Sequence, residues 1–362
     1  RVKIDCPYLG TVRRDLLDFD KLPECSETLS TFEVYCCLVC GVFLRGKNVQ
    51  SPAGAHALES EHHLFISLSD ATVVCLPEGY EVLDATLDDV KQNCLPCYTE
   101  IPRPQSGRAI DGSQFTSGAL GLLNLGQIDY LNSVVQLLAR VLEFQQVCLM
   151  RRQKPKTLTD SLSQLLKKLF NPQSFKSAVS PHELALNVQK LSEGKFTIKK
   201  QADVQVFLTW LLNRLYKEAK PIGKLFRGKL QTSDKTVSFF HIPVEIALHD
   251  VYGSQTVVNL EQLLEGFTIL KPPRYLLIFI KRFKRNRFFL EKLKTEVAWP
   301  NELNWGGRTW NWLGLVEHTG LAETGHYKSF FIHGDQTFEA SDQDVRASLL
   351  ASVASPYVLL YN

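Results

Sequence analysis

The sequence lacks the features that mark membrane-bound or secreted proteins. No run of about 18 consecutive apolar residues occurs in its 362 residues, so no membrane span is predicted. The first ten residues, RVKIDCPYLG, contain no apolar signal region, so no secretory leader is expected there. The formal net charge is only +3, which does not indicate nucleic-acid binding by the whole molecule. An apolar content of 44% is enough for more than one domain with its own core.

Cysteine is almost absent after the first hundred residues. Only Cys148 lies beyond them, and the odd total of nine argues against a disulfide scaffold. The clustering instead favours a metal-binding module in an intracellular protein. The alternative is a set of buried thiols that pack as small hydrophobic side chains. The clustered residues are Cys6, Cys25, Cys36, Cys37, Cys40, Cys75, Cys94 and Cys97.

The chain divides near a stretch broken by proline, IPRPQSG at 101–107. We predict a small domain over 1–100, a linker over 101–114 and a larger domain over 115–362. Apolar periodicity predicts helices over 130–142, 158–170, 181–191 and 201–219. Strand-like runs follow at 237–242, 244–248, 275–280, 312–316, 327–332 and 357–360. Helices followed by strands indicate an α+β fold for the larger domain.

The small domain contains a spacing that is typical of zinc ligands. Cys37 and Cys40 form a CxxC turn, and His56 and His62 follow it. Two thiolates from a tight turn and two imidazoles from a later segment can surround zinc tetrahedrally. The sequence therefore predicts about one structural Zn²⁺ per chain, held by these four residues.

Some alternatives for metal binding remain open. His63 could replace His62, Cys36 could replace Cys37, and the histidine pair could instead be an exposed polar pair at a helix end. A second zinc site could be built from Cys6, Cys75, Cys94 and Cys97.

Two segments of the larger domain resemble the catalytic boxes of the ubiquitin-specific proteases. They are GLLNLGQIDYLNSVVQLL at 121–138 and Gly325-His326-Tyr327. In that family the position of Asp129 holds the attacking cysteine, and His326 matches the catalytic base. Asn124 matches the residue that donates to the developing oxyanion. The resemblance implies a papain-like fold with a helical thumb, a β-rich palm and fingers.

The resemblance also implies an inactive enzyme. A carboxylate is a poor nucleophile toward an amide, and a helix N-terminus stabilises its charge further. The stretch at 338–342, FEASD, places Ser341 at the position of the orienting acid, although a shift of one residue would put Asp342 there. We expect no catalysis, and we expect Asp129 and His326 to form a structural ion pair.

The small domain resembles the zinc-finger module found in deubiquitinases. The fullest versions of this module bind three zinc ions. Here two of the sites have lost ligands, because Tyr8, Thr28, Pro52 and Glu78 occupy positions where the resemblance implies histidine or cysteine. The stretch GVFLR at 41–45 departs from the pattern that grips the ubiquitin C-terminus, so ubiquitin binding is not implied. The fingers should be reduced, because 229–260 contain no CxxC knuckle.

The combination resembles the splicing-associated, catalytically inactive branch of this family. That resemblance implies a nuclear, non-catalytic factor that promotes assembly or maintenance of the spliceosomal tri-snRNP, with snRNP proteins as partners and with weak snRNA contact as a further option. A ubiquitin or ubiquitin-like reader in another nuclear pathway is the alternative. The basic run KRFKRNRFFLEKLK at 281–294 is a candidate RNA contact, although a solvated hairpin is the favoured interpretation. The similar segments are YLGTVRRDLLDFD at 8–20, CLVCG at 37–41, HH at 62–63, LP at 76–77, YE at 80–81, NP at 171–172, FK at 175–176 and VSPHE at 179–183.

Overall fold

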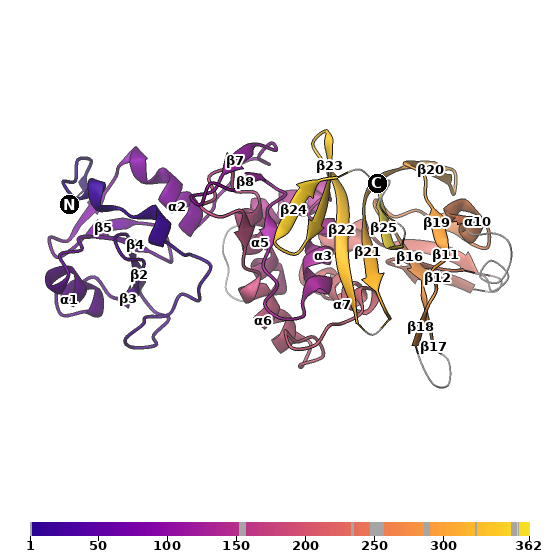
Figure 1. The fold of residues 1–362 in the computed structure, drawn as a ribbon, viewed down its shortest axis with the longest axis horizontal. Coiled ribbons are helices and arrows are strands. Elements are labelled where there is room, and N and C mark those ends of the chain that lie inside the picture. The colour runs from indigo at the N-terminus through magenta and orange to yellow at the C-terminus, as the bar shows by residue number, and fades with distance from the viewer. Residues whose placement is uncertain are drawn as a thin grey trace.

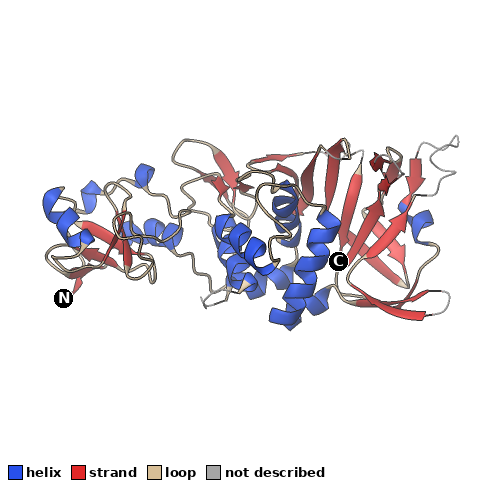
Figure 2. Cartoon of the chain, turned by 90° about the horizontal axis from the view of Figure 1, so that it is seen from below, coloured by secondary structure: helices blue, strands red, loops and turns tan. Residues whose placement is uncertain are grey.

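The chain folds into two connected parts, with a small mixed domain at one end and a larger α+β domain that occupies the rest (Figure 1). The computed structural model describes residues 2–151, 157–232, 235–246, 257–285, 290–322, 324–348, 353 and 355–362. In the larger domain a layer of helices lies between the small domain and the main sheet (Figure 2). None of the helices in these ranges combines the length and the apolar character that crossing a membrane needs.

The small domain is built on a six-stranded sheet with apolar residues on its buried face. Its strand order is β1-β6-β5-β4-β2-β3. Helix α1 (Pro52–Glu59) packs beside β3 and begins with a serine cap, because Ser51 Oγ accepts a hydrogen bond from Gly54 N at 3.3 Å. Helix α2 (Asp88–Cys94) leads toward the larger domain. The strands are β1 (Val2–Lys3), β2 (Val34–Cys37), β3 (Phe43–Arg45), β4 (Leu64–Ser67), β5 (Val73–Cys75) and β6 (Tyr80–Val82).

Helices α3 to α8 form the first half of the larger domain. The helix predicted over 130–142 is in fact two helices, separated at Val141, whose backbone is extended. Both helices bury apolar side chains in the same core, so the apolar pattern continues across the turn and does not reveal it. The bounds are α3 (Asp129–Leu138), α4 (Leu142–Leu149), α5 (Leu158–Leu169), α6 (His182–Leu191), α7 (Val204–Glu218) and α8 (Lys220–Leu225).

The second half is dominated by one sheet in the order β13-β16-β25-β21-β22-β23-β24, to which β20 adds by pairing with β21. Helix α3 packs against β22 and β21. The strand predicted over 237–242 covers the end of β12 and the start of β13, because the chain turns between them. The prediction over 244–248 extends past β13, and residues 247 and 248 lie outside the described ranges. The strands are β13 (Ile242–Glu245), β16 (Leu276–Lys281), β20 (Glu302–Trp305), β21 (Arg308–Gly320), β22 (Gly325–His333), β23 (Gln336–Ser341), β24 (Asp344–Ala347) and β25 (Pro356–Tyr361).

Short strands complete the larger domain. A three-stranded sheet in the order β12-β11-β15 occupies the place of the fingers. The predicted linker over 101–114 contains β7, which pairs with β8 in an antiparallel hairpin. The remaining elements are β7 (Ser106–Arg108), β8 (Gln114–Thr116), β9 (Gly121–Leu122), β10 (Ala178–Val179), β11 (Gly228–Thr232), β12 (Lys235–Phe239), β14 (Val257–Asn259), α10 (Leu260–Leu264), β15 (Thr268–Lys271), β17 (Phe283–Arg285), β18 (Leu290–Lys292) and β19 (Glu296–Ala298).

Polar contacts tie the small domain to the helical layer. Lys168 Nζ lies 2.9 Å from Asp20 Oδ1, and Lys176 Nζ lies 2.6 Å from Asp18 Oδ1. The side chain of Asn93 accepts from Phe175 N at 3.0 Å and donates to Gln173 O at 2.7 Å. Asp20 is largely buried at this junction, which favours a fixed arrangement of the two parts.

Candidate functional site

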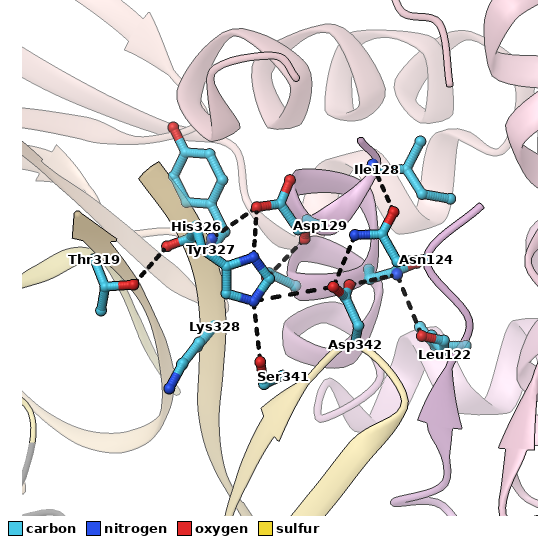
Figure 3. A network of polar contacts seen from close by, with 12 residues as sticks. Leu122, Asn124, Ile128, Asp129, Thr319, His326, Tyr327, Lys328, Ser341 and Asp342 are labelled. Atoms are coloured by element: carbon cyan, nitrogen blue, oxygen red, sulfur yellow. Dashed lines mark hydrogen bonds and ion pairs between the residues drawn. The ribbon is translucent and has the colours of Figure 1, made fainter. Parts of the chain in front are cut away.

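Asp129 is the first residue of α3, and its side chain points toward His326 on β22 (Figure 3). Its side chain is only 3% exposed. Oδ2 accepts from His326 Nδ1 at 3.0 Å, from Tyr327 N at 2.9 Å and from Gln201 Nε2 at 2.6 Å. Oδ1 accepts from Tyr130 N at 3.0 Å. All of these donors satisfy the carboxylate as a hydrogen-bond acceptor.

The surroundings favour the charged forms of both members of the pair. Burial opposes ionisation of Asp129, but the hydrogen bonds from His326, Tyr327 N and Gln201 outweigh it and hold the pKa below its ordinary value. The hydrogen bond to Asp129 raises the pKa of His326 above its ordinary value, against the effect of burial. The two side chains therefore form a hydrogen-bonded pair in which each favours the charged form of the other.

The other nitrogen of His326 faces the strand end that holds the acid in active relatives. Nε2 lies 3.0 Å from Ser341 Oγ and 3.9 Å from Asp342 Oδ2. Asp342 has a left-handed backbone, with φ at +52°, and its carboxylate accepts from Asn132 Nδ2 at 2.7 Å and from Asn124 Nδ2 at 2.8 Å. Burial raises the pKa of Asp342, and these two amides oppose the rise. Ser341 thus makes the direct contact, and Asp342 is held beside it.

The groups around His326 differ from those of a thiol hydrolase. In the described part of the chain, the side chains that contact His326 end in oxygen, and none ends in sulfur (Figure 3). Cys148 is buried on α4, and burial raises the pKa of its thiol to about 12. The amide nitrogen of Asn124 is already bonded to Asp342, while its oxygen accepts from Gly126 N and Ile128 N. The nucleophile position thus holds a carboxylate and not a thiol, and the Asn124 amide is engaged by Asp342.

The structure brings the four predicted metal ligands together. The ligand atoms of Cys37, Cys40, His56 and His62 all lie within 4.8 Å of one another, and the described residues contain no other such group of three or more. His56 Nε2 is 3.1 Å from His62 Nδ1 and 3.4 Å from Cys40 Sγ, and Cys37 Sγ is 3.6 Å from His62 Nδ1. Zinc with bonds of about 2.3 Å to sulfur and about 2.0 Å to nitrogen separates tetrahedral ligands by about 3.3–3.8 Å. The donor set therefore fits zinc.

The alternative ligands are used elsewhere. His63 Nδ1 lies 2.8 Å from Leu76 O, and its ring stacks on Tyr8 at 3.9 Å between centroids. The thiol of Cys36 is buried and lies 3.5 Å from Cys37 O. Cys36 points away from Cys37 because neighbouring positions on β2 face opposite sides. His63 lies in the segment before β4, where its ring is engaged by Leu76 O and Tyr8.

The eroded zinc position around Cys6, Tyr8, Cys75 and Glu78 contains hydrogen bonds between protein groups. Glu78 Oε1 accepts from Tyr8 OH at 3.4 Å, and its Oε2 accepts from Cys75 Sγ at 3.3 Å. Cys6 Sγ lies 3.2 Å from Tyr80 OH. Cys94 and Cys97 do not join these residues, since Cys94 Sγ bonds to Ser67 O and Cys97 is exposed. The side chains of the first group satisfy one another without an ion.

Two further stretches considered in the sequence have side chains engaged within the protein. Phe43, in the stretch that grips the ubiquitin tail in active relatives, is buried in the core of the small domain. In the basic run, β17 pairs antiparallel with β18, as a hairpin requires, while residues 286–289 lie outside the described ranges. Arg282 is fully buried, and Lys292 Nζ donates to His318 O at 2.6 Å. These two cations are therefore engaged within the protein.

Sequence reasoning missed the residues that complete the Asp129 site. Gln201 donates through Nε2 to Asp129 and also to Gly325 O at 2.9 Å, so it bridges the helical side and the histidine strand. Asn132 holds Asp342. The only signal for Gln201 is its place at the start of QADVQVFL, which resembles a helix of the family but does not reveal this contact.

Comparisons with known proteins agree with the two-part architecture. A family model described as "Ubiquitin carboxyl-terminal hydrolase" matches residues 120–361, and one described as "Zn-finger in ubiquitin-hydrolases and other protein" matches residues 25–87. "Ubiquitin carboxyl-terminal hydrolase 39" of Mus musculus is 30% identical, covering 82% of this chain and 66% of that protein. "Probable mRNA-splicing protein ubp10" of Schizosaccharomyces pombe is 29% identical, covering 81% and 71%. The chain thus spans about two thirds of the length of these relatives.

A solved structure shares the fold over nearly the whole chain. It is described as "Crystal structure of an essential yeast splicing factor" and superposes with a TM-score of 0.86 at 22% sequence identity, covering 99% of both chains. Since this similarity includes the small domain, the arrangement of both parts is common to the two molecules.

Proposed function

Because the chain belongs to the ubiquitin carboxyl-terminal hydrolase family, we propose that it is a non-catalytic member that promotes assembly or maintenance of the spliceosomal tri-snRNP through protein–protein contacts. Similar proteins that are described as splicing factors support this role. A factor of this kind acts in the nucleus, and its partners are snRNP proteins.

One observation carries the non-catalytic part of the proposal. A carboxylate stands at the nucleophile position, and its Oδ2 already accepts from His326, Tyr327 N and Gln201. An ionised carboxylate with this many donors has little nucleophilic character, and attack on an amide would disrupt the ion pair. In this proposal the Asp129–His326 pair has a structural role, and outer surfaces of the protein bind its partners.

The small domain contributes a folded surface that depends on metal. We assign Cys37, Cys40, His56 and His62 as ligands of one structural zinc, which would tie α1 to β2 and the turn after it. The zinc has a structural role in this proposal and takes no part in chemistry.

The splicing role is tested in nuclear extract depleted of the endogenous protein. Adding back the wild-type chain should restore the tri-snRNP. Gradient sedimentation with detection of U4, U5 and U6 snRNA measures that restoration. His326→Gln should restore it equally well, because catalysis is not required. No restoration by the wild type would reject the splicing role. Diubiquitin cleavage by the wild type that is lost in His326→Gln would reject the non-catalytic assignment.

A further inference from the structure

Strand β24 is the outer strand of the main sheet, and its free side borders a groove. In the described residues β24 pairs with β23 on one side and with no strand on the other. The groove has a volume of about 1040 Å³ and runs between β24 and the β7–β8 hairpin. We call it the β24 groove. Figure 1 shows that β24 and the hairpin lie near one another at the helical side of the sheet.

The register shows which main-chain groups face the groove. Residues of β24 pair antiparallel with β23, with Phe338 opposite Ala347 and Ala340 opposite Val345. Ser348 N donates to Thr337 O at 2.9 Å, which makes that position a hydrogen-bonded pair. Hydrogen-bonded and non-hydrogen-bonded pairs alternate along an antiparallel ladder. The N–H and C=O groups of Val345 and Ala347 therefore point outward into the groove.

The side chains of the groove form an apolar floor with a charged rim. Phe115, Phe338 and Ala119 are almost fully buried and contribute to the floor. The rim has three cations, Arg108, Lys328 and Arg346, against two carboxylates, Glu339 and Asp344. Glu339 pairs with both Lys328 and Arg346.

The rim carries one cation that the protein leaves available. Arg108 is exposed and takes part in no ion pair within the described ranges. An approaching carboxylate would meet an excess of positive charge at this end of the groove.

We propose that the β24 groove binds an extended peptide segment of a partner protein, which adds to the sheet as a further strand. Unpaired N–H and C=O groups along a strand bind another strand, and alternate side chains of that strand then face the floor. The segment should place apolar side chains over Phe115 and Phe338 and a carboxylate near Arg108. The four residues of β24 limit the pairing, so affinity should be in the micromolar range, which suits a reversible assembly.

This docking edge is separate from the Asp129–His326 pair, and it does not depend on the identity of the complex that the chain joins. Ser341 lines one end of the groove, so the groove begins beside His326 and leads away from it along β24. A short strand with charged residues also limits indiscriminate pairing with other sheet edges.

The test uses a phage-displayed library of short random peptides, selected on the wild-type chain and counter-selected on Ala347→Pro. Proline removes the outward N–H of Ala347, while pairing with β23 does not use that group. Selected peptides should contain alternating apolar residues and an acidic residue, and Ala347→Pro should weaken their binding by roughly tenfold or more. Ala347→Ser is the matched control, because it keeps the N–H and should bind as the wild type does.

Three further measurements keep the result interpretable. Arg108→Glu lies on the hairpin, not on the sheet, and should also weaken the same peptides. In the wild-type chain, a bound peptide should slow hydrogen exchange of the amides of Val345 and Ala347. Thermal unfolding verifies that each variant is folded. The inference is wrong if no peptide is selected, if selected peptides bind Ala347→Pro unchanged, or if these two amides gain no protection.

Discussion

Asp129 Oδ2 and His326 Nδ1 lie 3.0 Å apart, in the positions that hold thiol and base in active relatives. The same geometry that would activate a thiol here stabilises a fixed charge. The other donors to Asp129 Oδ2 are Tyr327 N, on β22 with His326, and Gln201 Nε2, in the segment before α7. These contacts connect the helical layer to the sheet.

Asp129→Cys should not be sufficient to restore cleavage. The introduced thiol would lie beside His326, so it should react with iodoacetamide faster than buried Cys148 does. Ubiquitin cleavage should stay at background in a fluorogenic ubiquitin assay, because Ser341 stands at the acid position and Asn124 is bonded to Asp342. Robust turnover by this single variant would show that only the nucleophile had been lost.

The contribution of the ion pair to stability should depend on pH. The raised pKa of His326 means that its contribution is present below its ordinary pKa of about 6.5 and disappears as pH rises through the higher, folded-state value. The lowered pKa of Asp129 means that its contribution is present above about pH 4 and disappears as pH falls through the lower, folded-state value. The pair therefore contributes most between about pH 4 and pH 6.5.

Urea unfolding of the wild type and of His326→Gln checks this pH dependence. The difference in free energy of unfolding should be larger at about pH 5.5 than at about pH 9. His182→Gln, on α6 and away from Asp129, is the control and should show no such change. A difference that is constant with pH would contradict the charged-pair interpretation.

Zinc content should follow the Cys37, Cys40, His56 and His62 cluster. Elemental analysis should find about one zinc per chain, and Cys40→Ser should lose it and unfold residues 1–95 while the larger domain keeps its transition. Cys97→Ser changes an exposed cysteine outside the cluster and should retain the metal. Two zincs in the wild type, or an undiminished content in Cys40→Ser, would refute the assignment.

Gly41, directly after the CxxC turn, should tolerate no side chain. Its φ is +74°, and a Cβ there would lie 2.2 Å from Leu16 O. Gly79 has a similar φ of +72°, but the nearest atom to its Cβ would be 4.0 Å away. Gly79→Ala should therefore cost only backbone strain of about 1 kcal/mol, and Gly41→Ala should cost clearly more. Equal losses of thermal stability would show that the close contact with Leu16 is unimportant.

Much of the fold could be predicted because apolar periodicity reports burial. The predicted helices over 158–170 and 181–191 agree with α5 and α6 within a residue, since leucines recur at helical spacing in both. The break at Val141 could not be predicted, because both adjoining helices bury apolar side chains in the same core. The turn between β12 and β13 was missed for a related reason, since apolar residues continue across it.

By itself, the sequence determined which chemical groups exist: a carboxylate at Asp129 in place of a thiol, an imidazole at His326 and four soft ligands in the small domain. Only the tertiary structure decided how those groups are satisfied. Gln201 and Tyr327 reach Asp129 from 72 and 198 residues away, and among the described residues no strand pairs with the outer side of β24. Residue type fixes what a side chain can donate or accept, whereas its partner depends on which distant segments pack beside it.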